Sequence, residues 1–249
     1  MKMTLDTSVL NAKILKPLSR IVDDCILTIN ENHIESIATV ASGGIIIYTK
    51  YNVDTDIDDE IDLNIKDISK LTSVLNCIKG QTIDMTVERD AHIKYKSDEF
   101  KFKFGLTEDG VIPKPKLKKD KLENIKFNTS TPLKVKIFYD ILKASSFIKS
   151  DDVKLYFYTK SDDDGSGLYC DITNKVIINS DSITIKLSDD YDGEDISKEL
   201  ICDIDHIRKM NIQKDSDIYM YFNSERGFTI FDLIDEAGRV RYILPTLSK

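Results

Sequence analysis

Two acidic segments, residues 54–60 and 162–164, have the residue types that could bind a divalent cation. Carboxylate oxygens are the ligands that Mg²⁺ and Ca²⁺ prefer. The first segment lacks the glycine and the glutamate at the spacing of an EF-hand loop. A third acidic run, residues 189–192, follows an expected strand. We interpret these runs as solvated turns, and we predict no metal and no cofactor.

The cysteines and histidines lie far apart in the sequence. Cys25, Cys77, Cys170 and Cys202 form no CxxC pair, and the three histidines are not at metal-ligand spacing. We predict four reduced, half-buried core thiols. The sequence also contains no GxGxxG, GxxxxGK[ST], GxSxG or HExxH motif. No acid–base pair stands out, so we predict that the protein is not an enzyme.

The overall charge is acidic. The 249 residues contain 35 Lys and Arg against 43 Asp and Glu, a net charge of −8. Affinity for phosphate comes mainly from cationic side chains, so only a clustered subset of cations would make this chain bind nucleic acid. No apolar run reaches the roughly 18 residues of a membrane helix. The start lacks the apolar region of a secretion signal, so we expect a cytoplasmic protein without a membrane partner.

Strand patterns dominate, and a few helical patterns interrupt them, which predicts an α+β protein. Lys101 and Lys103 alternate with Phe100, Phe102 and Phe104, as in a strand with one buried face. We expect further strands at residues 25–30, 33–40, 45–51, 82–88, 153–158, 167–172, 183–187, 218–222, 228–233 and 239–244. We expect helices at residues 7–22, 67–79, 133–149 and 203–210. Thr7 or Ser8 would cap the first helix, Gly80 would end the second, and Thr131-Pro132 would open the third.

Residues 105–124 interrupt the regular pattern. They contain Pro113, Pro115 and a run of lysines without a steady period, which is typical of an extended linker. The linker separates a first domain, residues 1–104, from a second, residues 125–249. Each half is expected to begin with a helix and to contain a second one. Aligning the first helices at a shift of 123 residues matches Lys13 with Lys136 and Arg20 with Lys143, which indicates a duplicated domain.

Cations gather on the polar faces of these helices. At about 100° per residue, the apolar side chains of each helix face away from a mostly basic stripe. Any one such stripe is typical of a solvated helix, but the shared basic sign in an acidic chain indicates a polyanionic partner. The cations that we expect to face this polyanion are Lys13, Lys16, Arg20, Lys66, Lys70, Lys136, Lys143 and Lys209.

Two half-chains with paired helices on strands, basic helix faces and a long connector resemble the DNA sliding clamps. These are the ring-forming processivity factors of DNA polymerases, such as proliferating cell nuclear antigen and the T4-type phage clamps. Residues 187–194, LSDDYDGE, resemble a stretch in the second domain of the phage clamps. Residues 241–245, RYILP, resemble the last strand and tail of the eukaryotic and archaeal clamps, although the tail departs from the eukaryotic pattern after Pro245.

The resemblance implies two similar clamp domains, with antiparallel sheets outside and four helices lining a pore. Three chains would close head-to-tail into a ring around duplex DNA, bound without regard to sequence. A clamp loader and a DNA polymerase would be the partners. The resemblance places partner peptides at Ile112, Leu117, Leu244, Pro245 and Leu247. It places the subunit interface at the edge strand with Phe100, Phe102 and Phe104, paired with a strand containing Val176 and Ile178.

Two other functions stay open at this point. The chain could be a monomeric two-domain interaction scaffold, with the same helices and no self-association. It could also be a metal-dependent phosphate-processing enzyme built on Asp54 and Asp56, although no second catalytic group accompanies them. The Lys- and Ile-rich composition without Trp indicates an AT-rich genome, which suits a phage and would place the protein in the cytoplasm of a bacterial host.

Overall fold

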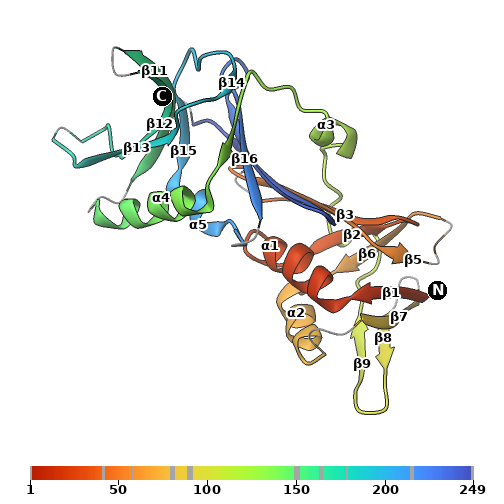
Figure 1. Ribbon diagram of the computed structural model, residues 1–249. Coiled ribbons are helices and arrows are strands. Elements are labelled where there is room, and N and C mark those ends of the chain that lie inside the picture. Colours follow the sequence, from red (N-terminus) through yellow and green to blue (C-terminus); the bar gives the residue numbers. More distant parts are fainter. Residues whose placement is uncertain are drawn as a thin grey trace. The chain divides into compact units, whose positions relative to one another are not determined.

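The computed structural model divides into two compact units (Figure 1). Unit 1 contains Met1–Glu123 and Glu236–Val240, and unit 2 contains Asn124–Asp235 and Arg241–Lys249. The structure describes residues 2–40, 43–55, 57, 59–78, 82–88, 92–148, 152–162, 165–177, 179–213 and 216–247. The chain passes to unit 2 directly after a short helix, α3 (Lys119–Glu123), within the segment for which we expected extended chain.

In its described residues, unit 1 contains two sets of antiparallel strands, two helical segments that pack together, and α3. One sheet has the order β5-β1-β7-β8-β9. Its strands are β1 (Lys2–Asp6), β5 (Asp54–Thr55), β7 (Thr82–Glu88), β8 (His92–Lys96) and β9 (Lys101–Gly105). The other sheet has the order β4-β3-β2-β6. Its strands are β2 (Cys25–Ile29), β3 (His33–Thr39), β4 (Ile46–Asn52) and β6 (Ile61–Ile65).

The first residues of β18 (Gly238–Pro245) belong to unit 1 and lie beside β4. The backbone N–H of Asn52 donates to the carbonyl of Ala237 at 2.7 Å. Gly238 packs so closely here that a Cβ atom would lie 2.2 Å from the carbonyl oxygen of Lys50. Only glycine permits this approach, so β4 and the start of β18 depend on it.

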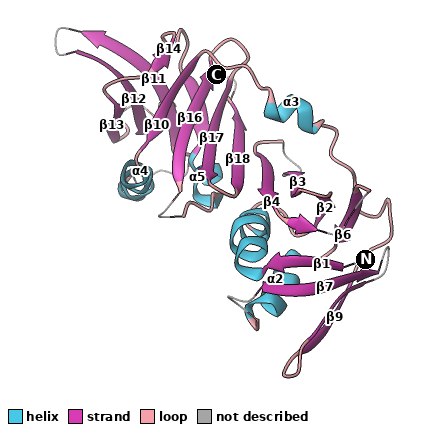
Figure 2. Ribbon diagram, turned by 45° about the vertical axis from the view of Figure 1, so that its right-hand side comes forward, coloured by secondary structure: helices cyan, strands magenta, loops and turns pink. Residues whose placement is uncertain are grey.

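Unit 2 repeats this arrangement. One sheet contains β14-β10-β16-β17-β18 and the other has the order β13-β12-β11-β15. The strands are β10 (Thr129–Leu133), β11 (Lys154–Asp162), β12 (Gly165–Thr173), β13 (Ser182–Ser188), β14 (Asp192–Gly193), β15 (Leu200–Asp203), β16 (Asp217–Asn223) and β17 (Phe228–Asp235). The helices α4 (Val135–Phe147) and α5 (Ile204–Lys209) lie next to each other (Figure 2). The order of elements therefore matches that of unit 1 strand for strand.

The expected start of each half is wrong, because a strand precedes each first helix. Pro132 lies inside β10 and does not open a helix; α4 begins only at Val135, after Lys134. β1 and β10 occupy equivalent places in the two units and begin at Lys2 and Thr129, which are 127 residues apart. The shift of 123 residues taken from the helices therefore misplaces the repeat by about one helical turn.

The first helix of unit 1 is also irregular. A π-helix, η1 (Val9–Leu15), leads into α1 (Lys16–Ser19). Asp6 accepts a hydrogen bond from the backbone N–H of Ser8 at 2.7 Å, so Asp6 performs the capping that we assigned to Thr7 or Ser8. The Ser8 hydroxyl also donates to Asp6. The hydrogen bonds from the Ser8 side chain and backbone hold the pKa of Asp6 below its usual value. The second helix was expected at residues 67–79; Asp67 caps it as α2 (Ile68–Asn76), and Gly80 lies outside the described residues.

Candidate nucleic-acid interface and connector

The two helical segments of unit 1 pack against each other (Figure 1). Their polar faces are largely exposed. Asn11 Nδ2 donates to Asn76 Oδ1 at 2.8 Å, which joins η1 to α2. The apolar stripe of each helix is buried: Leu10, Ile14 and Leu18 in η1 and α1, and Ile68, Leu71 and Leu75 in α2. Burial of these stripes fixes which residues of each helix face solvent.

Predicted DNA-binding residues of unit 1 lie on the solvent side. Lys16, Arg20, Lys66 and Lys70 are exposed, and Lys13 is half-buried. Lys66 and Lys70 line an open cavity of about 570 Å³ together with Asp23, Asp67, Ser69, Phe104 and Gly105. The lysines thus share this part of the surface with two carboxylates, which keeps its positive potential moderate.

Unit 2 presents an equivalent helix pair. Lys136 and Lys143 on α4 and Lys209 on α5 are exposed. Tyr139 joins the pair to the segment after α5, because its hydroxyl donates to the carbonyl of Ile212 at 3.2 Å. The acids Asp140 and Asp205 are exposed on the same helices. Each unit therefore has its own set of exposed helix cations, and neither set is purely basic.

Sequence reasoning missed Arg208. This residue is exposed on α5, where Nη1 lies 2.9 Å from Asp205 Oδ1 and Nη2 donates to Ser145 Oγ of α4 at 3.2 Å. It therefore cross-links the two helices. Its spacing of three residues from Asp205 was the available signal, because residues at i and i+3 are neighbours on a helix.

The predicted edge strand of unit 1 is a sheet edge. β9 is the last strand of its sheet, with Phe102 and Phe104 buried, Phe100 half-buried and both lysines exposed. The expectation that Val176 lies in a strand is wrong. Val176 lies in a turn and is 83% exposed, and Ile178 lies outside the described residues. The other sheet of unit 2, which corresponds to the β4-β3-β2-β6 strands of unit 1, has β13 at its edge, shortly after that turn.

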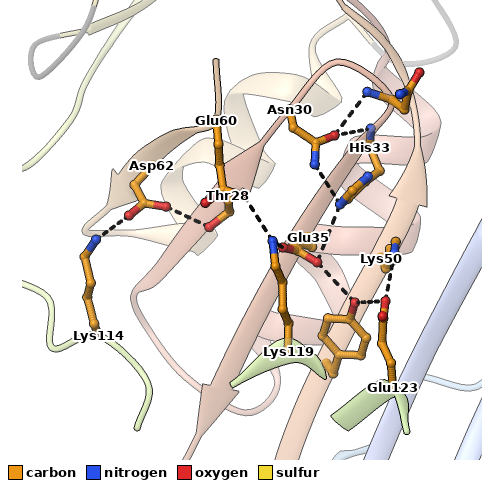
Figure 3. Close-up of polar contacts among 12 residues, drawn as sticks. Thr28, Asn30, His33, Glu35, Lys50, Glu60, Asp62, Lys114, Lys119 and Glu123 are labelled. Atoms are coloured by element: carbon orange, nitrogen blue, oxygen red, sulfur yellow. Dashed lines mark hydrogen bonds and ion pairs between the residues drawn. The ribbon is translucent and has the colours of Figure 1, made fainter. Parts of the chain in front are cut away.

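The linker at residues 105–124, called the connector from here on, is held on the sheet of unit 1 by a network of ion pairs and hydrogen bonds (Figure 3). Lys119 Nζ lies 3.0 Å from Glu35 Oε1 and 3.0 Å from Glu60 Oε2. These hydrogen bonds, the one to Glu35 first, raise the pKa of Lys119. Further along the connector, Lys114 Nζ lies 2.6 Å from Asp62 Oδ2. Burial acts to raise the pKa of Asp62, but bonds from Lys114 and Thr28 outweigh it and lower the pKa.

At the end of the connector, α3 contributes Glu123 to the same network (Figure 3). Lys50 Nζ lies 2.7 Å from Glu123 Oε1, and the Tyr48 hydroxyl donates to the same oxygen at 2.8 Å. The bond from Lys50 is the main cause of a lowered pKa at Glu123. The Tyr48 hydroxyl also lies 3.1 Å from Glu35 Oε2, so one phenol links both carboxylates. The connector follows a fixed path over the sheet.

The predicted partner-binding residues differ in accessibility. Leu117 is 37% exposed, and in unit 1 it lines a cavity of about 440 Å³ beneath the connector. Ile112 and, in unit 2, Leu244 are buried, so these two side chains support the fold and cannot meet a partner directly. Pro245 is exposed, and the N–H of Leu247 donates to the carbonyl of Ile201 at 2.9 Å. The start of the tail is therefore fixed on β15.

Three of the four thiols are inert. Cys25, Cys170 and Cys202 are buried, and burial raises their pKa values, that of Cys202 to about 12. Cys77 is exposed, which corrects the expectation of a half-buried core thiol there.

In the described ranges, no three His, Cys, Asp or Glu residues gather as a metal-binding group. Asp56, Asp58, Asp163 and Asp164 of the acidic segments lie outside those ranges. Of the helices described, none is long and apolar enough to cross a membrane.

Neither a protein-family model nor a curated protein matches the chain. Solved structures do match it. PCNA of A. fulgidus, in a structure described as the C-terminal region of FEN-1 bound to that PCNA, superposes with a TM-score of 0.76 at 14% identity, over 100% of this chain and 98% of that one. PCNA of Thermococcus kodakaraensis gives 0.73 at 13% identity, over 99% of both chains.

The chain has the sliding-clamp fold. A putative DNA polymerase III beta subunit from Eubacterium rectale matches with a TM-score of 0.73 at 15% identity, over 100% of this chain and 66% of that one. The two-unit clamp fold thus accounts for the whole chain, whereas it spans only part of that beta subunit. The similarity lies in topology, since few residues are identical, and it shows the fold alone.

Proposed function

We propose that this protein encircles duplex DNA as a head-to-tail homotrimer and tethers a DNA polymerase as its processivity factor, without catalysing a reaction. The observation that carries the proposal is the duplicated unit: each copy presents a helix pair with exposed cations on one side of its sheets. In a ring, these helix pairs would face a common pore.

Strand equivalence supports head-to-tail assembly. In the duplicated order of elements, β13 of unit 2 corresponds to β4 of unit 1, and β9 corresponds to β18. In unit 1, β4 already has the start of β18 beside it. By contrast, β9 of unit 1 and β13 of unit 2 are both edge strands of their sheets. The same pairing made between two chains would join β9 of one to β13 of the next. Such a contact joins unlike surfaces, and it closes into a ring when the rotation permits. It would also remove both exposed edges.

The cations suit a protein that slides. Contacts with phosphates carry no sequence information, and a moderate number of them attracts DNA without fixing it. We propose Lys13, Lys16, Arg20, Lys66, Lys70, Lys136, Lys143 and Lys209 as the pore residues, and we add Arg208. The net charge of −8 would keep DNA away from the outer surface. A polymerase held on such a ring stays at a high effective concentration near the primer end.

Partner contacts would use the accessible parts of the connector and the tail. We propose Leu117, Pro245 and Leu247 for polymerase and clamp-loader peptides. Ile112 and Leu244 would support these positions from the core, since both are buried. If the gene belongs to a phage, the protein would act in the cytoplasm of a bacterial host.

Two measurements test the proposal together. Light scattering is expected to give three times the chain mass of 28.4 kDa. After loading, the protein is expected to stay on closed circular DNA and to slide off the same DNA once it is linearised. A mass of 28.4 kDa at micromolar concentration, with equal release from circular and linear DNA, would favour a monomeric scaffold and contradict the ring.

A further inference from the structure

The connector closes over a groove that it fills with its own lysines. The groove has a volume of about 440 Å³ and lies between the connector and strands β2, β3 and β6 of unit 1. Ile26, Ile37 and Leu117 supply its apolar lining. Carboxylates from the sheet side face ammonium groups from the connector side (Figure 3). The polar halves of the groove thus belong to two different segments.

Two of the three carboxylates have polar contacts within the sheet. Glu35 is 5% exposed, and its Oε2 lies 3.1 Å from the Tyr48 hydroxyl oxygen. Asp62 accepts a bond from Thr28 Oγ1 at 2.7 Å. Glu60 stands directly before β6. Glu35 and Asp62 thus each have a polar contact with a sheet residue besides the connector lysines, and together with Glu60 they form a site for two cations.

The cations, by contrast, sit on long side chains that stay open to water. The Lys114 side chain is 70% exposed and that of Lys119 is 42% exposed. Ion pairs as exposed as these contribute little net stability and weaken with salt, because water and ions compete for both partners. A Lys or Arg from another chain can replace either lysine with the same chemistry.

We propose that the connector is a releasable strap whose Lys114 and Lys119 occupy the site of a basic partner segment. The partner is an extended peptide with two basic side chains for Asp62 and the Glu35–Glu60 pair, and one apolar side chain for the lining between them. When it binds, the two connector lysines are released. This inference rests on the proposed docking of partners at the connector and specifies their chemistry.

The test uses the full chain and a fluorescein-labelled, unstructured ten-residue peptide in which two lysines flank a leucine, with fluorescence anisotropy as the readout. Lys114→Ala/Lys119→Ala is expected to bind the peptide about fivefold more tightly than wild type, because the competing ammonium groups are gone. Glu60→Gln/Asp62→Asn is expected to bind it about fivefold more weakly. Lysines with a purely structural role would give no gain in the first variant.

A matched control separates this site from general attraction to an acidic protein. Asp189→Asn/Asp190→Asn removes two exposed acids, one of which is also paired with a lysine, at 2.5 Å. The peptide affinity of this variant is expected to equal that of wild type. An equal loss in the control and in Glu60→Gln/Asp62→Asn would overturn the proposal, as would unchanged or weaker binding by the lysine variant. Retention on circular DNA is scored separately, so a protein that binds the peptide but is not a ring is recognised as such.

Discussion

Arg241 and Asp232 form a buried ion pair inside unit 2. Arg241 Nη2 lies 2.5 Å from Asp232 Oδ2, and Nε donates to the same oxygen at 3.1 Å. The side chains are 8% and 0% exposed. A buried charge is stable only with its counter-charge, so each residue makes the other tolerable in the core.

Removing one partner of this pair should therefore cost far more than removing both. Arg241→Ala is expected to lower the free energy of unfolding by about 3–5 kcal/mol, because it leaves a carboxylate alone in the core. Arg241→Met/Asp232→Leu is expected to recover most of that loss. Urea denaturation measures both. If the double variant is as unstable as Arg241→Ala, the loss of stability comes from the lost packing and hydrogen bonds of the pair and not from an unpaired buried charge.

The pore assignment predicts a charge-reversal effect that depends on position. Changing Lys13, Arg20 and Lys143 to Glu is expected to reduce polymerase stimulation and retention on circular DNA by at least about tenfold, since phosphate contacts dominate such binding. The oligomer mass should not change. The control changes Lys96, Lys126 and Lys198 to Glu. All three are exposed and lie outside η1, α1, α2, α4 and α5. Equal losses in both variants would refute the pore.

The edge strand β9 predicts a proline variant that blocks assembly and spares the fold. Ser97 N–H donates to the Phe100 carbonyl at 2.8 Å, and Lys103 lies opposite Lys94 in the register that follows. Antiparallel bonding alternates, so the N–H of Lys103 points away from β8, toward the free edge. Lys103→Pro is therefore expected to give monomers by light scattering with a near-normal melting temperature, whereas Lys103→Ala keeps the trimer. A trimeric proline variant would exclude β9 from the interface.

The connector network predicts a stability difference that depends on pH. Asp62 and Glu123 have pKa values below their ordinary 3.8 and 4.5, so their pairing stabilises the fold above those values and is lost as the pH falls through the lower folded-state pKa values. Asp62→Asn/Glu123→Gln is expected to unfold at most about 1 kcal/mol more easily than wild type at pH 7, because both pairs are partly exposed. The difference should shrink below about pH 4. A difference that is constant down to pH 2.5 would contradict this account.

The thiols predict a simple labelling pattern. Cys77 is exposed, and the other three are buried with raised pKa values, so only one thiol can present a reactive thiolate to solvent. A thiol reagent at pH 8 is expected to modify one cysteine per native chain rapidly and all four after denaturation. Cys77→Ser should abolish the rapid phase. Fast modification of a second thiol would reveal an opening of the core.

Much of the fold could be predicted from local pattern. The alternation of Phe102 and Phe104 with lysines gave β9 and its buried face, because a strand places successive side chains on opposite sides. Asp67 marked the start of α2 because its carboxylate accepts the N–H of Lys70. The exposed positions of Lys16, Arg20, Lys136 and Lys143 followed from helical period alone.

What failed depends on partners distant in sequence. Thr131 and Pro132 resemble a helix start, yet they belong to β10, where they lie opposite residues of β16. Likewise, the sequence around residues 176–178 does not indicate that β13 is the edge strand of its sheet. A strand is an edge because no other strand pairs with its outer side, and this depends on the whole sheet. Local and periodic patterns sufficed to predict the α+β class, the duplication and the basic helix faces. The 127-residue repeat, the free edges and the connector held by lysines became visible only in the fold, because each requires contacts between segments that lie far apart along the chain.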